Sequence, residues 1–330
     1  MECHVCGYPH TTMGCPPSTT SSDTKLCTPR ATMVQIAMQP DFVLCDVFAD
    51  APFAGNPLAV FPDGGGLSDA EMFALAREFG WSEITFVALQ GSSSPRVRIW
   101  TPRGELPFAG HPTVGTAVVL AAGGHIEVGR HVFELGIGPV EVEVAEVGPS
   151  GGRATMTQRA PEFKDIFDDP ARLAAALGLL DEDLAPGLPA QIVSTGLDHF
   201  MVPLASLDAL GRARGHRDLL PDVLDAIGAR RAYVFTVETP QSTAAARARL
   251  LAVDYEDAAT GSAAGPLGGY LVQYGLHRAG EMEIEQGIEM GRPSRILVDV
   301  PSEGHIIGPV RVSGDVRIWA SGVLREHAQS

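Results

Sequence analysis

The chain contains an internal repeat, because residues 96–137 match residues 247–288 without a gap at an offset of 151. Ten aligned positions are identical. They are Arg96/Arg247, Arg98/Arg249, Glu105/Glu256, Gly110/Gly261, Leu120/Leu271, Gly124/Gly275, Gly129/Gly280, Glu134/Glu285, Gly136/Gly287 and Ile137/Ile288. Solenoids stack at least three short repeats, whereas this chain has two copies of a long unit. The repeat therefore predicts a pair of pseudo-symmetric domains.

Each copy has the same local order of features. An arginine-bearing strand leads into a turn, then into G-H-P or G-S-A, and then into a run of apolar and small residues. Proline and serine are favoured helix starts, so helices are predicted to open at Pro112 and near Ser262. Both predicted helices are apolar on every side, which is typical of a helix enclosed within a domain. We expect an α+β fold in which each half is a barrel-like sheet wrapped around one central helix.

Other periodic segments predict further elements. Runs rich in β-branched and aromatic residues predict strands at 42–49, 56–62, 84–90, 96–102, 140–144, 232–238, 295–300 and 316–324. Helices are predicted at 67–80, 168–179 and 219–228. In the first of these, Ser68 and Glu71 form a capping-box pattern and Gly80 marks the end.

Length and composition limit the domain number and the partners. A chain of 330 residues with 45% hydrophobic content is long enough for two domains. We expect a disordered extension at 1–40, a first domain at 41–160 and a second domain at 161–330. It is left open whether the last strand belongs to the second domain or returns to the first domain. The net charge of −16 argues against nucleic acid or an anionic membrane as the main partner. No apolar run reaches about 18 residues, and a cytoplasmic protein is expected.

The opening segment holds four of the five cysteines: Cys3, Cys6, Cys15 and Cys27. It is rich in Ser, Thr and Pro, and it is interpreted as a disordered extension. The motif "CHVC", with His4 and His10, raises a zinc-binding alternative, but a single C-x-x-C is a weak signal. No metal site is therefore predicted. Cys45 is expected in the core.

The stretch "DYEDAATGSAAGPLGGY" (254–270) could be a phosphate-binding loop, a linker or a helix start. It lacks G-x-x-x-x-G-K-[ST] and G-x-G-x-x-G, which argues against a phosphate loop. Its place in the repeat indicates a turn that leads into a buried helix. If the two halves face each other, both helix N-termini point into one cleft, and their free N–H groups would bind a carboxylate.

Polar residues beside these turns suit proton transfer next to a carboxylate or carbonyl. They are His111, Asp257, Ser262 and, in the turn of "GWSEITF", Ser82 and Glu83. Structural explanations stay open for them: a solvated turn residue, a core histidine, and helix caps. The repeat-matched Glu105 and Glu256 are expected to pair with the strand arginines.

Five motifs in this order resemble the PhzF phenazine-biosynthesis family: "DVFADAPFAGNPLAVF", "SEITF", "ELPFAGHPTVGTA", "EDAATGSAAGPLGGYL" and "EQGIEMGRPSRI". The resemblance extends from about residue 41 to 325. It implies a diaminopimelate-epimerase-like fold of two similar domains with the active site between them. It also implies cofactor-free isomerisation; the founding member isomerises trans-2,3-dihydro-3-hydroxyanthranilate by moving a proton. Relatives are commonly homodimers.

The resemblance also implies residue roles. Glu83 matches the acid/base glutamate of S-E-T-x-F, His111 the histidine of G-H-P, and Asp257 and Ser262 the polar residues of E-D-P-A-T-G-S. The neighbouring residues expected to bind substrate are Ser82, Gly110, Thr260 and Gly261. The chain departs from the family pattern at Ile84, where threonine is usual, and at Ala258, where proline is usual. These departures bear on the shape of the pocket and on the substrate. The alternative is a non-catalytic binding or scaffold protein that retains the cleft.

Overall fold

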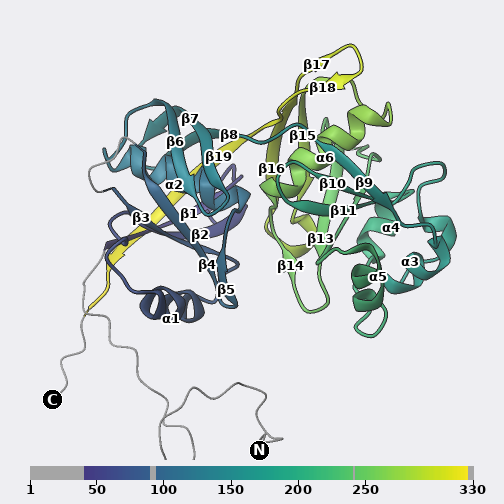
Figure 1. Cartoon of the computed structure of the whole chain (residues 1–330), viewed down its shortest axis with the longest axis horizontal. Coiled ribbons are helices and arrows are strands. Elements are labelled where there is room, and N and C mark those ends of the chain that lie inside the picture. Colours follow the sequence, from purple (N-terminus) through teal and green to yellow (C-terminus); the bar gives the residue numbers. More distant parts are fainter. Residues whose placement is uncertain (1–40, 90–93, 241, 326–330) are drawn as a thin grey trace, which may run out of the picture. The chain divides into compact units, whose positions relative to one another are not determined.

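The computed structural model describes residues 41–89, 94–240 and 242–325. The predicted extension at 1–40 and its four cysteines lie outside these residues. The described part is a mixed α+β fold, in which two stretches of sheet each accompany one central helix (Figure 1). It contains no helix that is long and apolar enough to cross a membrane.

The described residues of the first half of the chain form nine strands. They are β1 (Asp41–Val47), β2 (Asn56–Phe61), β3 (Ile84–Ala88), β4 (Arg96–Thr101), β5 (Gly104–Leu106), β6 (Gly129–Leu135), β7 (Gly138–Gly148), β8 (Gly151–Thr157) and β9 (Glu162–Ile166). The second half supplies β10 (Gln191–Ser194), β11 (Asp198–Pro203), β12 (Ala232–Thr236), β13 (Ala246–Leu251), β14 (Glu256–Asp257), β15 (Gly280–Gln286), β16 (Ser294–Val300), β17 (Ser302–Glu303), β18 (Ile306–Ile307) and β19 (Arg311–Val323).

Six α-helices occur in the described residues. They are α1 (Asp69–Phe79), α2 (Gly110–Ala122), α3 (Pro170–Ala176), α4 (Leu207–Arg212), α5 (Leu220–Ile227) and α6 (Gly261–Gln273). Two 3₁₀ turns span Asp181–Asp183 and Ile288–Met290.

Eight strands close into a barrel around α2. Their pairings run β1–β2–β3–β4–β6–β7–β8–β19 and return to β1, so no strand of this ring is left as an edge. Helix α2 packs against β1, β2, β3, β7, β8 and β19, and its residues from Gly110 to Ala121 are all buried. The all-round apolar pattern therefore predicted this helix correctly.

A second run of pairings has the same alternation. It follows β9–β10–β11–β12–β13–β15–β16–β19, with parallel pairs β11/β12 and β13/β15 where the first run has β2/β3 and β4/β6. Helix α6 packs against β10, β11, β16 and β19.

Strand β19 belongs to both runs. Its first residues pair with β16, and residues 316–323 pair with β1, so the last strand lies in the barrel around α2. The chain end thus returns to the half in which the described structure begins.

The two central helices keep the spacing of the sequence repeat. Both are 13 residues long, and their first residues, Gly110 and Gly261, are 151 positions apart. They begin one or two residues before the predicted starts, a difference within the ordinary uncertainty of helix ends. Helix α6 needs small residues because the sheet lies close to it: a Cβ on Gly268 would come within 2.7 Å of Val298.

Other predicted elements are also present, with some omissions. Helix α1 has the expected capping box between Ser68 and Glu71, and Gly80 ends it in the left-handed conformation at φ 63°. The pattern did not predict α4 or the strands β5, β6, β8 to β11, β14, β15, β17 and β18. Cys45 is fully buried in the core around α2, as expected.

Candidate active site

The N-termini of α2 and α6 are in direct contact. A Cβ on Gly110 would lie 2.5 Å from the backbone nitrogen of Ser262, so only glycine fits there. The N-cap residues, Ala109 and Thr260, make no side-chain cap hydrogen bond. Because the first N–H groups of a helix have no partner within it, both helix ends can bind an anion at this point.

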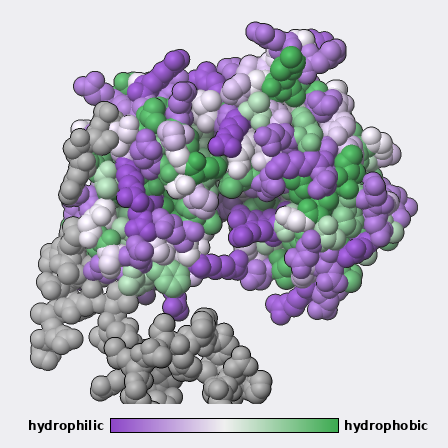
Figure 2. Space-filling model, in the orientation of Figure 1, coloured by the Kyte–Doolittle hydropathy of each residue, from purple (hydrophilic) through white to green (hydrophobic). Residues whose placement is uncertain are grey.

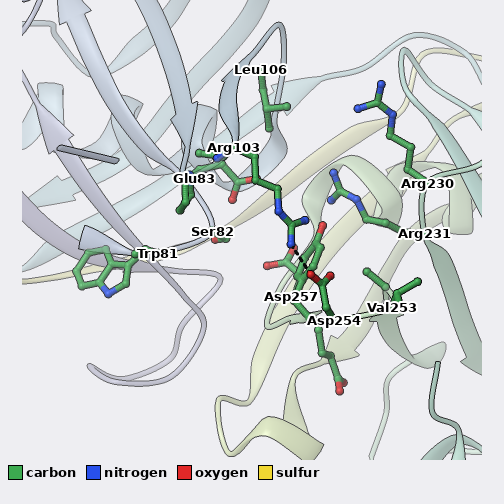
Figure 3. Close-up of a pocket in the computed structure, with 16 residues that line it drawn as sticks. Trp81, Ser82, Glu83, Arg103, Leu106, Arg230, Arg231, Val253, Asp254 and Asp257 are labelled. Carbon is green, nitrogen blue, oxygen red and sulfur yellow. Dashed lines mark hydrogen bonds and ion pairs between the residues drawn. The ribbon is translucent and has the colours of Figure 1, made fainter. Parts of the chain in front are cut away.

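Two adjoining cavities lie beside these helix ends. The inner cavity, about 320 Å³, is lined by both helix N-termini, and the outer cavity has a volume of about 520 Å³. They share Glu83, Leu106, Arg230, Arg231 and Asp257, several of which converge in Figure 3. The space-filling view shows hydrophilic residues gathered at the hollow between the two halves (Figure 2).

Glu83 stands directly before β3, and its side chain is 11% exposed. Its Oε2 atom has no hydrogen-bond partner and lies 3.8 Å from Nε2 of His111, which also has none. Burial, and then the charge of Asp257, raise the pKa of Glu83 to about 7, although the Ser82 hydroxyl opposes this shift. A carboxyl group with this pKa is present in both protonation states near neutral pH.

His111 lies in the first turn of α2 and is neutral, because burial lowers its pKa to about 3. The ring hydrogen-bonds to the backbone of Pro57, whose carbonyl can only accept, so the ring donates there. Since Nε2 has no partner, Nδ1 carries this proton. The amide nitrogen of Asn56 lies 3.2 Å from Nδ1 of His111. Its two hydrogens are donated to Asp257 and to the carbonyl of Ala259. The Nε2 atom of this cavity-lining residue therefore keeps a lone pair that no described group uses.

Asp257 is held by two short hydrogen bonds. Its Oδ1 accepts from the Asn56 amide at 2.7 Å and its Oδ2 from the Thr260 hydroxyl at 2.6 Å. Burial nevertheless raises the pKa of Asp257, and these bonds work against the shift. Asn56 also accepts from Ser82 at 3.2 Å, so its amide links Ser82 to Asp257, which lies 201 positions after Asn56.

Gln286 fixes the turn that carries Asp257. Its Oε1 accepts from the backbone of Thr260 at 3.0 Å and from the Tyr233 hydroxyl at 2.9 Å. Its Nε2 donates to the carbonyl of Asp257 at 2.8 Å. Gln286 is fully buried, so this network replaces the water that the turn would otherwise bind.

The structure brings the predicted site residues together. Seven of them line the inner cavity: Glu83, Gly110, His111, Asp257, Thr260, Gly261 and Ser262. Ser82 lines the outer cavity. Sequence reasoning did not identify Asn56, Gln286 or Arg231. Asn56 was predicted only as the first residue of a strand, and no local signal showed its long-range partners.

The repeat-matched glutamates pair with the strand arginines, as expected. Glu105 accepts two hydrogen bonds of 2.7 Å from Arg98, and Glu256 accepts bonds of 2.7 and 2.8 Å from Arg249. These pairs are structural. The described residues include no cluster of three or more His, Cys, Asp or Glu that could hold a metal ion, and "CHVC" lies outside them.

The curated relatives of this chain are named isomerases, and the buried acid/base groups described above are of the kind that an isomerase uses. A family model described as "Phenazine biosynthesis-like protein" (PhzC-PhzF) matches residues 45–322. The chain belongs to this family.

Two curated relatives are similar over almost their whole length. The chain is 36% identical to an uncharacterized isomerase of Mesorhizobium japonicum, covering 86% of this chain and 98% of the relative. It is 35% identical to trans-2,3-dihydro-3-hydroxyanthranilate isomerase of Pseudomonas fluorescens, covering 86% and 99%.

Solved structures agree with the fold. A predicted epimerase from Pseudomonas aeruginosa matches with a TM-score of 0.76 and 36% identity, covering 88% of this chain and all of the other. A PhzF-family phenazine biosynthesis protein from Bacillus anthracis matches with a TM-score of 0.79 and 27% identity, covering 87% and 99%. A probable proline racemase, at 12% identity and a TM-score of 0.58, shares the fold alone.

Proposed function

We propose that the protein is a cofactor-independent isomerase that moves a proton on a small carboxylate-bearing metabolite. The observation that carries this proposal is the pair of facing, buried, unpartnered atoms, Glu83 Oε2 and His111 Nε2, beside two helix N-termini. Buried polar atoms are normally hydrogen-bonded, so two such atoms at one cavity point to a ligand that completes them.

The proposed substrate orientation follows from the charges of the cavity. The substrate carboxylate binds the N–H groups at the start of α2 and α6, assisted by the Ser262 hydroxyl. As a proton leaves the neighbouring carbon, negative charge spreads onto the carboxylate as in an enolate. The helix ends stabilise this charge without a metal or a basic side chain.

Glu83 is the proposed acid and base. Ionised, it removes a proton from one carbon. The carboxylic acid formed in this way exchanges its proton with solvent and then gives a proton to a second carbon, and the double bond shifts between the two carbons. A pKa of about 7 suits both steps, because neither protonation state is costly to reach. His111 and Asp257 are proposed to hold polar groups of the substrate.

The domain arrangement belongs to the same proposal. We assign residues 41–160, joined by residues 316–323 of β19, and the rest of residues 161–330 to two pseudo-symmetric, diaminopimelate-epimerase-like domains, each a barrel-like sheet around a central helix. Arg103 and Asp254 occupy equivalent positions in the two copies of the repeat, and they form an ion pair of 2.9 Å. This contact between equivalent positions supports the assignment. A cytoplasmic homodimer, with the substrate as its small-molecule partner, remains a prediction.

Solvent-deuterium exchange tests the function. The first probe is trans-2,3-dihydro-3-hydroxyanthranilate, for which the Pseudomonas fluorescens relative is named, followed by cyclic unsaturated carboxylates. In D₂O the parental protein should incorporate deuterium into a substrate, and Glu83→Gln should not. Glu141→Gln, at an exposed glutamate of β7, is the matched control and should exchange at the parental rate. Parental exchange by Glu83→Gln would show that Glu83 is not the base.

A further inference from the structure

The inner cavity contains a cationic side that the proposed proton transfer does not use. Arg231 immediately precedes β12, is half-buried and lines both cavities. In Figure 3 its guanidinium extends from the side of Val253 toward the side that carries Glu83 and Arg103. No salt bridge among the described residues involves Arg231, and its ring contact is with Tyr255, at 5.7 Å from the ring centroid.

His199 lies beside Arg231, because the residues that follow them, Phe200 and Ala232, pair in the parallel β11–β12 ladder. It stands on β11, is 6% exposed, and its buried Nε2 atom has no hydrogen-bond partner. Burial lowers its pKa to about 3, with a further contribution from the positive charge of Arg231. His199 is therefore a neutral imidazole with one unused polar atom in a cavity that also has a guanidinium.

Packing alone does not explain this pair. A buried imidazole nitrogen without a partner is destabilising relative to a hydrogen-bonded one. A guanidinium is suited to bidentate binding of a carboxylate. The acids that Arg231 faces, Glu83 and Asp257, are the groups whose pKa values it lowers. It therefore balances their charge, and no side chain in the described part of the chain forms a salt bridge with it that an anion would have to displace.

We propose that Arg231 and His199 form a second anion subsite that binds an additional carboxylate of the substrate, so that the substrate class is a dicarboxylic acid. This inference rests on the proposed binding of the first carboxylate at the helix N-termini. The two carboxylates would occupy opposite sides of the inner cavity, with Glu83 between them. Arg231 supplies the full positive charge that a dianion needs in a cavity already lined by two acids.

Benzene dicarboxylates can test the subsite without turnover. Phthalate, isophthalate and terephthalate vary the span between the two carboxylates, and the monomethyl ester of each keeps the shape but removes one charge. Binding is measured by calorimetry at constant ionic strength. At least one diacid should bind the parental protein ten-fold or more tightly than its monoester.

Variants then assign the preference to Arg231. Arg231→Gln should weaken the binding of that diacid at least ten-fold and change the binding of the monoester less than two-fold. Arg231→Lys should bind the diacid with an affinity between those of Arg231→Gln and the parental protein. Arg217→Gln, at an exposed arginine away from both cavities, controls for net charge and should change neither. His199→Gln, which retains a donor, should weaken the diacid less than Arg231→Gln does.

The possible failures are distinguishable. If monoesters bind and no diacid binds more tightly, or if Arg231→Gln weakens both alike, the second subsite is wrong and the proposed isomerase function stands. If none of the probes binds, carboxylate binding at both positions is wrong. Loss of deuterium exchange tests Glu83 separately.

Discussion

Replacing Glu83 with glutamine should stabilise the protein while removing its activity. The carboxyl is buried, and its pKa is raised from the ordinary 4.5 to about 7. Below pH 4.5 both the folded and the unfolded protein carry the proton on this group. Between pH 4.5 and 7 the unfolded state loses the proton and the folded state keeps it, so folding stability decreases as pH rises. Above pH 7 the loss is complete.

The size of this effect follows from the two pKa values. At about 1.4 kcal/mol per pH unit, a pKa raised from 4.5 to about 7 costs about 3 kcal/mol of folding free energy above pH 7. Glutamine has the same shape and does not titrate. Glu83→Gln should therefore exceed the parental stability by about 1 kcal/mol at pH 5.5 and by about 3 kcal/mol at pH 8.5.

Urea denaturation at a series of pH values from 5.5 to 8.5 measures this difference. Glu141→Gln, an exposed substitution of the same chemistry, should follow the parental curve at every pH. A Glu83→Gln variant that is less stable than the parental protein at pH 8.5 would refute the reasoning. So would a stability difference that does not change with pH, because it would show that Glu83 does not titrate in this range.

Two structural predictions concern the repeat. Glu256→Gln should lower the free energy of unfolding by about 3 kcal/mol, because it leaves the buried Arg249 without its salt-bridge partner. The equivalent Glu105→Gln, in a more exposed pair, should lower the free energy of unfolding by less than about 1 kcal/mol. Equal costs, measured by urea denaturation, would contradict this. Gly110→Ala would place a methyl carbon 2.5 Å from a backbone nitrogen of α6 and should cost about 3 kcal/mol. Gly211→Ala, in an open position of α4, should stabilise by up to about 1 kcal/mol, and thermal denaturation that ranks them oppositely would refute the contact.

The sequence by itself was sufficient for features that depend on near neighbours. The capping box of Ser68 and Glu71 lies within one helical turn, and the Arg249–Glu256 pair lies within one hairpin. The two central helices could be recognised because their apolar residues face every direction, a pattern that burial alone requires. The offset of 151 then related the two helix starts before any contact between them was known.

Tertiary structure decided which distant residues meet. Asn56 joins Asp257 across 201 positions, and His111 faces Glu83 at 3.8 Å, because closed strand pairings and the contact between two helix ends place them there. Strand β19 enters the barrel around α2 for the same reason: register and packing, not local pattern, select its partners. The position of Arg231 beside the inner cavity is equally non-local. Side-chain type and spacing therefore identified the candidate catalytic residues, and only the folded structure determined which of them lie close together.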